Sequence, residues 1–156
     1  MFATGGQPAV AAVPVPFDSR VRAKLSADQT VVTGTWSIIE FDEVDYDGKD
    51  ELNDAIHAIE ITDDGTYSIK YSIALQDLDL GKEAQCQIWV DAAVVAGGSD
   101  SLGNAVFTTN RLNASVDMNL LAGDIVKLKL YHNQGADRII YPTTEGGSVL
   151  CLRRIA

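Results

Sequence analysis

Residues 67–75, with the sequence YSIKYSIAL, alternate between large apolar side chains and small or polar ones at every step. The apolar set consists of Tyr67, Ile69, Tyr71, Ile73 and Leu75, and the other set of Ser68, Lys70, Ser72 and Ala74. Successive side chains of a β-strand point to opposite faces, so this period of two predicts a strand with one buried face. Tyr67 would then bury a phenol whose hydroxyl needs a hydrogen-bond partner.

The same alternation recurs further along the chain, in residues 112–120 (LNASVDMNL) and 125–131 (IVKLKLY). Further strands are expected at 20–25, 29–33, 35–42, 56–61, 84–91, 105–109, 138–141 and 148–155. Glycine-containing turn signals separate these segments, for example at Thr33-Gly34 and Gly97-Gly98. No segment shows a convincing helical stripe of apolar residues. Short strands joined by glycine turns predict an all-β sandwich or barrel.

The length and charge of the chain limit its class. A chain of 156 residues fits one domain with a substantial core. The formal net charge of −10 argues against nucleic acid or an anionic membrane as a partner, because both require a basic surface. We find no basic export-signal region and no apolar stretch of membrane-spanning length, and therefore expect a protein that stays soluble.

Residues 1–17 (MFATGGQPAVAAVPVPF) contain no charged side chain, and their prolines exclude a helix. They fit either a disordered tail or an extended arm that docks on a neighbouring subunit or a larger assembly. Because an uncharged apolar segment is costly to leave in water, we consider docking a serious alternative, with Phe2, Val13 and Val15 as candidate contacts. We accordingly divide the chain into an N-terminal arm, 1–17, and a folded domain, 18–156.

Three segments, taken in order, resemble one family of jelly rolls. Residues 65–69 (GTYSI) look like its Gly-x-Tyr-x-Phe strand, 121–128 (LAGDIVKL) like its Gly-Asp hairpin, and 148–152 (SVLCL) like its closing strand. The family is the tumour-necrosis-factor and complement globular-head superfamily, and residues 28–47 are similar to the opening of its microbial and phage members. The resemblance implies a jelly-roll β-sandwich of about ten antiparallel strands over residues 20–155, assembled as a homotrimer.

The chain also departs from this pattern. Its closing strand lacks the family's usual aromatic residue and glycine, and no collagen-like Gly-x-y stalk precedes the domain. A microbial or viral member fits these departures better than an animal secreted one.

Two aromatic residues break the alternation of their strands. Trp89 falls on the polar face of its strand with Gln85 and Gln87, and Tyr131 falls on the same face as Lys127 and Lys129. Such residues are either simply exposed or part of an interface, where aromatic side chains are enriched. We name Trp89 and Tyr131 as candidate interface contacts.

The acidic run Asp42–Asp54 (DEVDYDGKDELND) invites a calcium-binding interpretation, because Glu43, Asp45, Asp47, Gly48 and Asp54 nearly fit an EF-hand loop. Its first ligand position is Glu, its last is Asp, and no flanking helices are expected, so we prefer a solvated acidic loop. A looser calcium site in this loop is the alternative, and we expect no other cofactor.

No catalytic motif is present, and we predict that the protein is not an enzyme. His57 and His132 are the only histidines, and neither lies near a nucleophile motif. The two cysteines, Cys86 and Cys151, both lie in apolar strand-like runs, and we favour buried free thiols over a disulfide.

These observations lead to two hypotheses of function. The first is a virion structural protein of a bacterial virus, such as a capsid decoration protein or head fibre, whose arm anchors a homotrimer to a capsid or other virion protein. The alternative is an extracellular or cell-surface recognition module that binds a receptor or a carbohydrate, with calcium as a possible aid.

Overall fold

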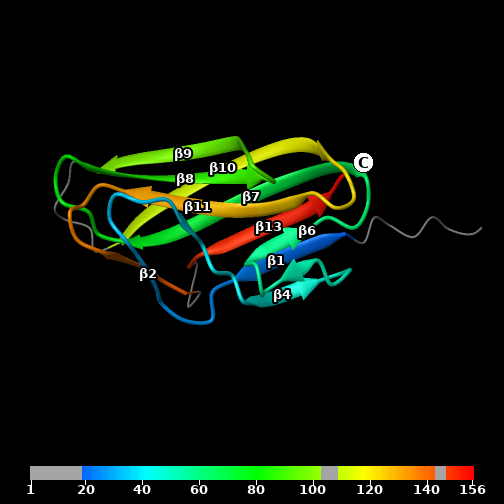
Figure 1. Ribbon diagram of the computed structural model, residues 1–156, viewed down its shortest axis with the longest axis horizontal. Helices are drawn as coiled ribbons and strands as arrows, with labels where there is room; N and C mark the ends of the chain where they lie inside the picture. The colour runs from blue at the N-terminus through cyan, green and yellow to red at the C-terminus, as the bar shows by residue number, and fades with distance from the viewer. Residues whose placement is uncertain (1–18, 103–108, 143–146) are drawn as a thin grey trace, which may run out of the picture.

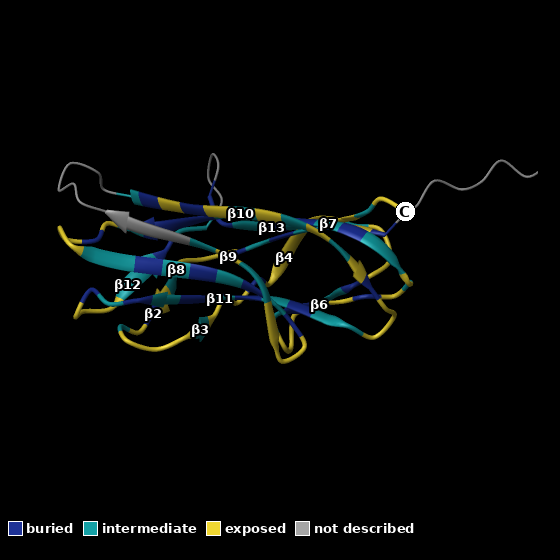
Figure 2. Ribbon diagram, turned by 90° about the horizontal axis from the view of Figure 1, so that it is seen from above, coloured by how far each residue is buried: buried dark blue, intermediate teal, exposed yellow. Residues whose placement is uncertain are grey.

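The computed structural model describes residues 19–102, 109–142 and 147–156, and it folds them into two antiparallel sheets stacked face to face (Figures 1 and 2). The first sheet contains β1 (Arg20–Lys24), β2 (Gln29–Val31), β4 (Glu43–Asp47), β7 (Gly65–Gln76), β10 (Thr109–Leu120), β12 (Arg138–Ile140) and β13 (Val149–Arg154). The second contains β3 (Ser37–Ile38), β5 (Leu52–Asn53), β6 (Ala58–Glu60), β8 (Lys82–Val90), β9 (Ala93–Leu102) and β11 (Ile125–His132). The predicted jelly-roll sandwich is confirmed.

Strands distant in the sequence lie side by side in both sheets. The main part of the first sheet has the order β10-β7-β13-β1-β4, and β12 joins β2 to the far end of β7. The second sheet has the order β5-β6-β11-β8-β9, with β3 running along β11. The first strand, β1, therefore lies between β4 and the last strand, β13, and pairs with both.

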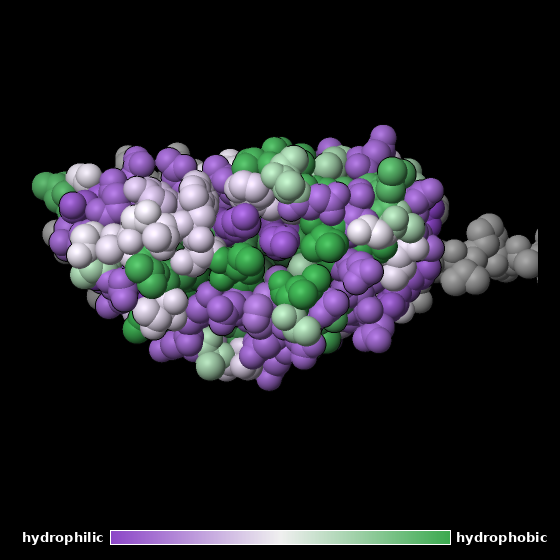
Figure 3. Space-filling model, in the orientation of Figure 1, coloured by the Kyte–Doolittle hydropathy of each residue, from purple (hydrophilic) through white to green (hydrophobic). Residues whose placement is uncertain are grey.

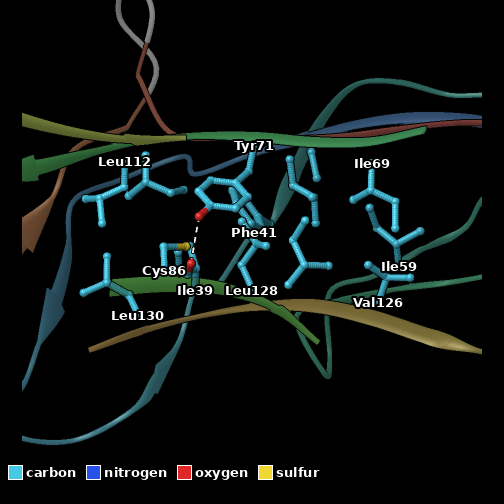
Figure 4. Packing of buried hydrophobic residues seen from close by; sticks show 14 of the residues in the cluster. Ile39, Phe41, Ile59, Ile69, Tyr71, Cys86, Leu112, Val126, Leu128 and Leu130 are labelled. Atoms are coloured by element: carbon cyan, nitrogen blue, oxygen red, sulfur yellow. Dashed lines mark hydrogen bonds between the residues drawn. The ribbon is translucent and has the colours of Figure 1, made fainter. Parts of the chain in front are cut away.

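The segment that predicted the fold forms the middle of the core. Its five apolar residues, Tyr67 to Leu75 at every second position, are all at most 3% exposed. They face Ile39, Phe41 and the inward residues of β8 and β11, such as Leu128 and Leu130 (Figure 4). Burying each large aliphatic side chain contributes roughly 1.5–3 kcal/mol, so this layer is a substantial part of what holds the two sheets together.

The two tyrosines of this segment each find the partner that a buried hydroxyl requires. Tyr67 donates to the carbonyl oxygen of Asp63 at 2.9 Å and lies 3.1 Å from the Ser19 hydroxyl. Tyr71 reaches across the sandwich: it donates to the carbonyl oxygen of Cys86 at 2.7 Å (Figure 4), and the amide of Gly98 donates to it at 3.1 Å. Tyr71 of the first sheet is thus hydrogen-bonded to two strands of the second.

Gly97 and Gly98 do not form the predicted turn; they lie inside β9, which the sequence pattern missed. A Cβ atom at Gly98 would lie 2.9 Å from the carbonyl oxygen of Asn113 on β10, closer than real Cβ atoms come. Glycine is needed there because the backbones of β9 and β10 approach each other where the two sheets meet.

The predicted boundaries also differ from the structure around β3 and β4. The expected strand 35–42 shrinks to the two residues of β3, and the acidic residues 43–47 form β4 where we expected a loop. The predicted strand 105–109 lies outside the described residues apart from Thr109, where β10 begins. The arm, residues 1–17, and its boundary with the domain also lie outside the described residues, so the two-part division stays a prediction.

Candidate functional site

Both tryptophans of the chain lie on the outward face of the second sheet. Trp89 on β8 is opposite Lys127 of β11, and Tyr131 of β11 is opposite Gln85 of β8, so the two predicted residues share one face. Trp36, which precedes β3, packs against Tyr131 with ring centroids 5.5 Å apart. We call the surface between Trp36 and Trp89 the tryptophan face; Figure 3 looks onto this side of the molecule, where hydrophobic and hydrophilic residues are intermixed.

Trp89 is covered by a lysine. The Nζ atom of Lys129 lies 3.7 Å from the centroid of the Trp89 ring, a cation–π contact. The indole Nε1 of Trp89 is buried and has no hydrogen-bond partner among the described residues. A buried polar group without a partner costs about 1–3 kcal/mol, so this donor is poorly placed in the isolated chain. The role of Trp89 and Tyr131 as interface contacts stays a prediction.

Sequence patterning missed Trp36, which is 41% exposed. Its neighbours Ile38, Ile39 and Phe41 are apolar on both faces of the segment, so alternation could not say which side is buried. The structure shows Ile39 and Phe41 inward, at no more than 1% exposed, which places Trp36 and Ile38 outward.

The outward face of the first sheet has a different chemistry, and we call it the charged face. Its basic side chains come from β1, β7 and β13: Arg20, Arg22, Lys24, Lys70 and Arg153. Arg22 pairs with Asp45 of β4, and Lys24 lies 2.8 Å from the same carboxylate. These ion pairs are partly exposed, so each contributes less than about 1 kcal/mol.

The long edge strands β9 and β10 run along the same side of the sandwich (Figure 1). Within the described ranges, β9 pairs only with β8 and β10 only with β7. Five apolar residues near this edge pack against the core but stay partly exposed: Val95, Ala96, Ala114, Val116 and Met118. We call this strip the open edge, because both sheets leave unpaired backbone and apolar surface there.

The acidic run Asp42–Asp54 is engaged in the fold. Asp42 accepts a hydrogen bond from the Ser26 amide at 2.8 Å, and Asp47 accepts from the amides of Glu51 and Leu52 at 2.9 and 2.7 Å. The expected loop is wrong for residues 43–47, which form a strand paired with β1 with Lys24 and Arg22 facing its carboxylates. Residues 43–46 are nevertheless exposed to solvent, as expected.

Glu51 is the one acidic residue of this run that is buried, at 2% exposure. Its carboxylate accepts hydrogen bonds from the hydroxyls of Ser19 and Thr62 at 2.8 Å and from the Thr62 amide at 3.1 Å. No group of three or more His, Cys, Asp or Glu side chains within the described ranges is arranged to hold a metal ion. Calcium binding, like the expected lack of any other cofactor, stays a prediction.

The histidines both make structural contacts. His132 is fully buried with its Nε2 3.1 Å from the Val31 carbonyl oxygen, and His57 Nδ1 lies 3.4 Å from the Phe41 carbonyl oxygen. His57 adopts a φ of 51°, a left-handed conformation in the turn before β6. Neither histidine is placed beside a nucleophile in the described part of the chain.

Both cysteines are free thiols, as predicted. Cys86 is fully buried, and desolvation raises the pKa of its thiol to about 12. Cys151 is only half-buried, on the charged face opposite Arg22 and Lys70, which corrects the expectation that both are buried. Burial also raises the pKa of Cys151, partly offset by the nearby Arg22. Neither thiol is activated as a nucleophile would be.

Comparison with known proteins identifies the fold. No family model matches the chain, and no curated protein matches it in sequence. Among solved structures it is similar to the Eiger TNF of S. frugiperda, with a TM-score of 0.66 and 12% identity over 88% of this chain and 92% of that one.

Two further structures extend the similarity. The globular domain of zebrafish complement 1qA has a TM-score of 0.66 and 11% identity over 88% of this chain and 98% of that one. Murine APRIL has a TM-score of 0.61 and 11% identity over 88% and 100%. The chain therefore has the jelly roll of the tumour-necrosis-factor and complement globular-head structures, as the sequence resemblance implied.

The described residues contain no helix with the length and hydropathy of a membrane span.

Proposed function

We propose that this chain is a non-enzymatic jelly-roll module that assembles as a homotrimer and acts by binding. The observation that carries the proposal is the fold, which matches TNF and complement globular-domain structures over 88% of the chain. The structural roles of His57 and His132 and the raised pKa of both thiols are consistent with a protein that performs no chemistry.

The open edge is the surface that we propose copies of the chain to share. Met118, Val116 and Ala114 of β10 point toward the interior yet stay partly exposed, because the sandwich is not fully closed there. A neighbouring copy that covered this strip would bury apolar area and shield two long edge strands. In a trimer each copy would use this edge against a different patch of the next, closing a ring of three.

Replacing Met118 by Asp tests this interface. The charge would have to be desolvated between two copies, so we expect the variant to sediment as a monomer while keeping the β-sheet circular dichroism of the parent. Leu80→Asp is the matched control: Leu80 is 69% exposed in the loop between β7 and β8, and its substitution should leave the trimer intact. A trimeric Met118→Asp variant would exclude the open edge as the interface.

The more specific form of the proposal is a virion structural protein of a bacterial virus, either a capsid decoration protein or a head fibre. Residues 1–17 would anchor the trimer to a capsid or other virion protein, with Phe2, Val13 and Val15 as contacts. The support for this form is the composition of the arm, which is apolar, proline-containing and uncharged beside a domain with a net charge of −10.

Deleting residues 1–17 separates anchoring from assembly. We expect the truncated protein to remain folded and trimeric but to be absent from purified particles, measured by quantitative immunoblotting of gradient-purified virions. Glu60→Gln in the full-length chain, a substitution at an exposed position of β6, serves as a control for incorporation. Normal incorporation of the truncated protein would contradict the anchoring role.

A recognition module at a cell surface or in the extracellular space is the second candidate. The tryptophan face favours it, because exposed aromatic side chains on a rigid sheet are typical of binding surfaces.

A further inference from the structure

Both tryptophans of the chain lie on the tryptophan face, although the core is built from large apolar side chains. Trp36 is 41% exposed and Ile38, two residues further on, is 36% exposed; Val94, opposite Trp89 on β9, is 47% exposed. Aromatic and aliphatic side chains gathered on one solvent-facing surface weaken solubility unless something binds there. This surface therefore needs an explanation that the fold alone does not supply.

Register fixes the layout of the face. Three cross-strand pairs between β11 and β8 succeed one another: Tyr131 with Gln85, Lys129 with Gln87, and Lys127 with Trp89. The aromatic pair of Trp36 and Tyr131 lies at one end of the face. Trp89 lies at the other end, opposite Lys127, which precedes Tyr131 by four residues on β11. At about 3.3 Å per residue, the two ends are roughly 13 Å apart.

The size of the face indicates the kind of ligand. From β3 across β11 and β8 to β9 there are three inter-strand spacings of about 4.8 Å, so the face covers roughly 200 Å². A strip of this length with aromatic rings at both ends fits a short stretch of a chain-like ligand built from small rings.

The polar groups between the rings indicate its chemistry. Gln87 presents an amide that can donate and accept, and its side chain has no hydrogen bond to any described residue. Lys127 and Lys129 add two positive charges, and no Asp or Glu belongs to the three cross-strand pairs. The nearest acidic side chain along β8 is Glu83, one pair further on, where it accepts a hydrogen bond from Gln85 at 3.4 Å. Lys127 and Lys129 thus place two positive charges side by side on this face, and the exposed Glu40, two residues after Ile38, is an acidic neighbour.

We propose that the tryptophan face binds an acidic carbohydrate, a polymer of sugar rings that carry carboxylate groups. The apolar C–H face of one sugar ring packs on Trp36, its hydroxyls bond to the Gln87 amide, and a carboxylate pairs with Lys127 and Lys129. Movement of Lys129 toward this carboxylate uncovers the face of the Trp89 ring, on which a second sugar ring then packs. The site lies away from the open edge and does not depend on the trimer.

Intrinsic fluorescence tests the proposal directly, because the only two tryptophans are both at the site. The full chain is titrated with polygalacturonate, a uronate polymer, with dextran as the neutral polymer and poly-L-glutamate as the acidic polymer without sugar rings. We expect a saturable spectral change with polygalacturonate and at least tenfold weaker binding of the other two. Trp36→Ala and the double variant Lys127→Gln/Lys129→Gln should each weaken polygalacturonate binding at least tenfold.

Two controls keep the result interpretable. Lys70→Gln removes an exposed lysine from the charged face and should leave the affinity unchanged. Gln87→Ala provides a second test if a tryptophan variant misfolds. It changes one outward side chain and should weaken binding severalfold without affecting the fold. The absence of a response to polygalacturonate would overturn the proposal. Equal binding of dextran would also overturn it, because the lysines would then have no role. Equal binding of poly-L-glutamate would instead indicate an acidic protein surface as the partner and would likewise overturn it.

Discussion

The two outward faces of this sandwich rest on the same core and yet differ in chemistry. The charged face pairs Arg22 and Lys24 with Asp45, so two of its five basic side chains are paired within the chain. The tryptophan face leaves Gln87 and Lys127 without partners among the described residues and the indole nitrogen of Trp89 buried but unbonded. This unbonded buried donor supports the tryptophan face as the surface that we propose for recognition.

Both faces depend on the buried contact that holds the sheets back to back, and removing it should have the largest effect. Tyr71→Phe leaves the Cys86 carbonyl and the Gly98 amide without the hydroxyl between them. We expect the free energy of unfolding to fall by about 2 kcal/mol, measured by urea denaturation. Tyr46→Phe, at an exposed position on β4, is the control and should change stability by less than about 0.5 kcal/mol. Equal effects of the two substitutions would mean that Tyr71 does not link the sheets.

Alkaline pH should destabilise the fold through the buried thiol of Cys86. Its pKa is raised from 9.0 to about 12 in the folded state, so between these values the unfolded chain loses the proton first. The stabilising contribution is thus complete below pH 9 and is lost as the pH rises toward 12. At pH 10 the loss is about 1.4 kcal/mol relative to pH 8. Denaturation of Cys86→Ala at both pH values should show a smaller loss; an identical loss would assign the effect to other groups.

On the tryptophan face we expect substitution to cost little stability. Trp36→Ala removes an exposed ring whose only ring contact in the described part is Tyr131, so the free energy of unfolding should fall by about 0.5–1 kcal/mol. Thermal melting of the variant checks this. A loss above about 3 kcal/mol would show that Trp36 belongs to the core and would weaken the contrast between the two faces.

The smallest effect is expected on the charged face. Asp45→Asn removes the carboxylate shared by Arg22 and Lys24, and should cost about 0.5 kcal/mol at low salt. In 1 M NaCl, where screening acts over about 3 Å, the difference from the parent should disappear. A loss of stability that persists in 1 M NaCl would mean that the Asp45 carboxylate contributes more than an exposed, screened ion pair.

The core was predictable from the sequence because alternation is a local signal. Tyr67 to Leu75 show the period of two without interruption, and all five apolar residues are buried as expected. Prediction failed where a strand depends on its neighbours. β4 is acidic and forms because β1 supplies Arg22 and Lys24 opposite it, and β9 contains Gly98 because β10 comes too close for a side chain.

The candidate site was predictable only in part for the same reason. Trp89 and Tyr131 break a clear alternation and could be assigned to an outward face from the sequence. Trp36 could not, because its segment is apolar on both sides and its stacking on Tyr131 joins residues 95 positions apart. The contact of Lys129 with the Trp89 ring joins two neighbouring strands, which no local pattern encodes.

The central claim is that this jelly roll works as a homotrimer. Sedimentation equilibrium of the full-length chain over a wide concentration range measures this most directly, because the mass is independent of shape. We predict a single species of about 50 kDa, three times the 16.7 kDa of one chain. A mass of 16.7 kDa that persists at the highest concentration would contradict the claim.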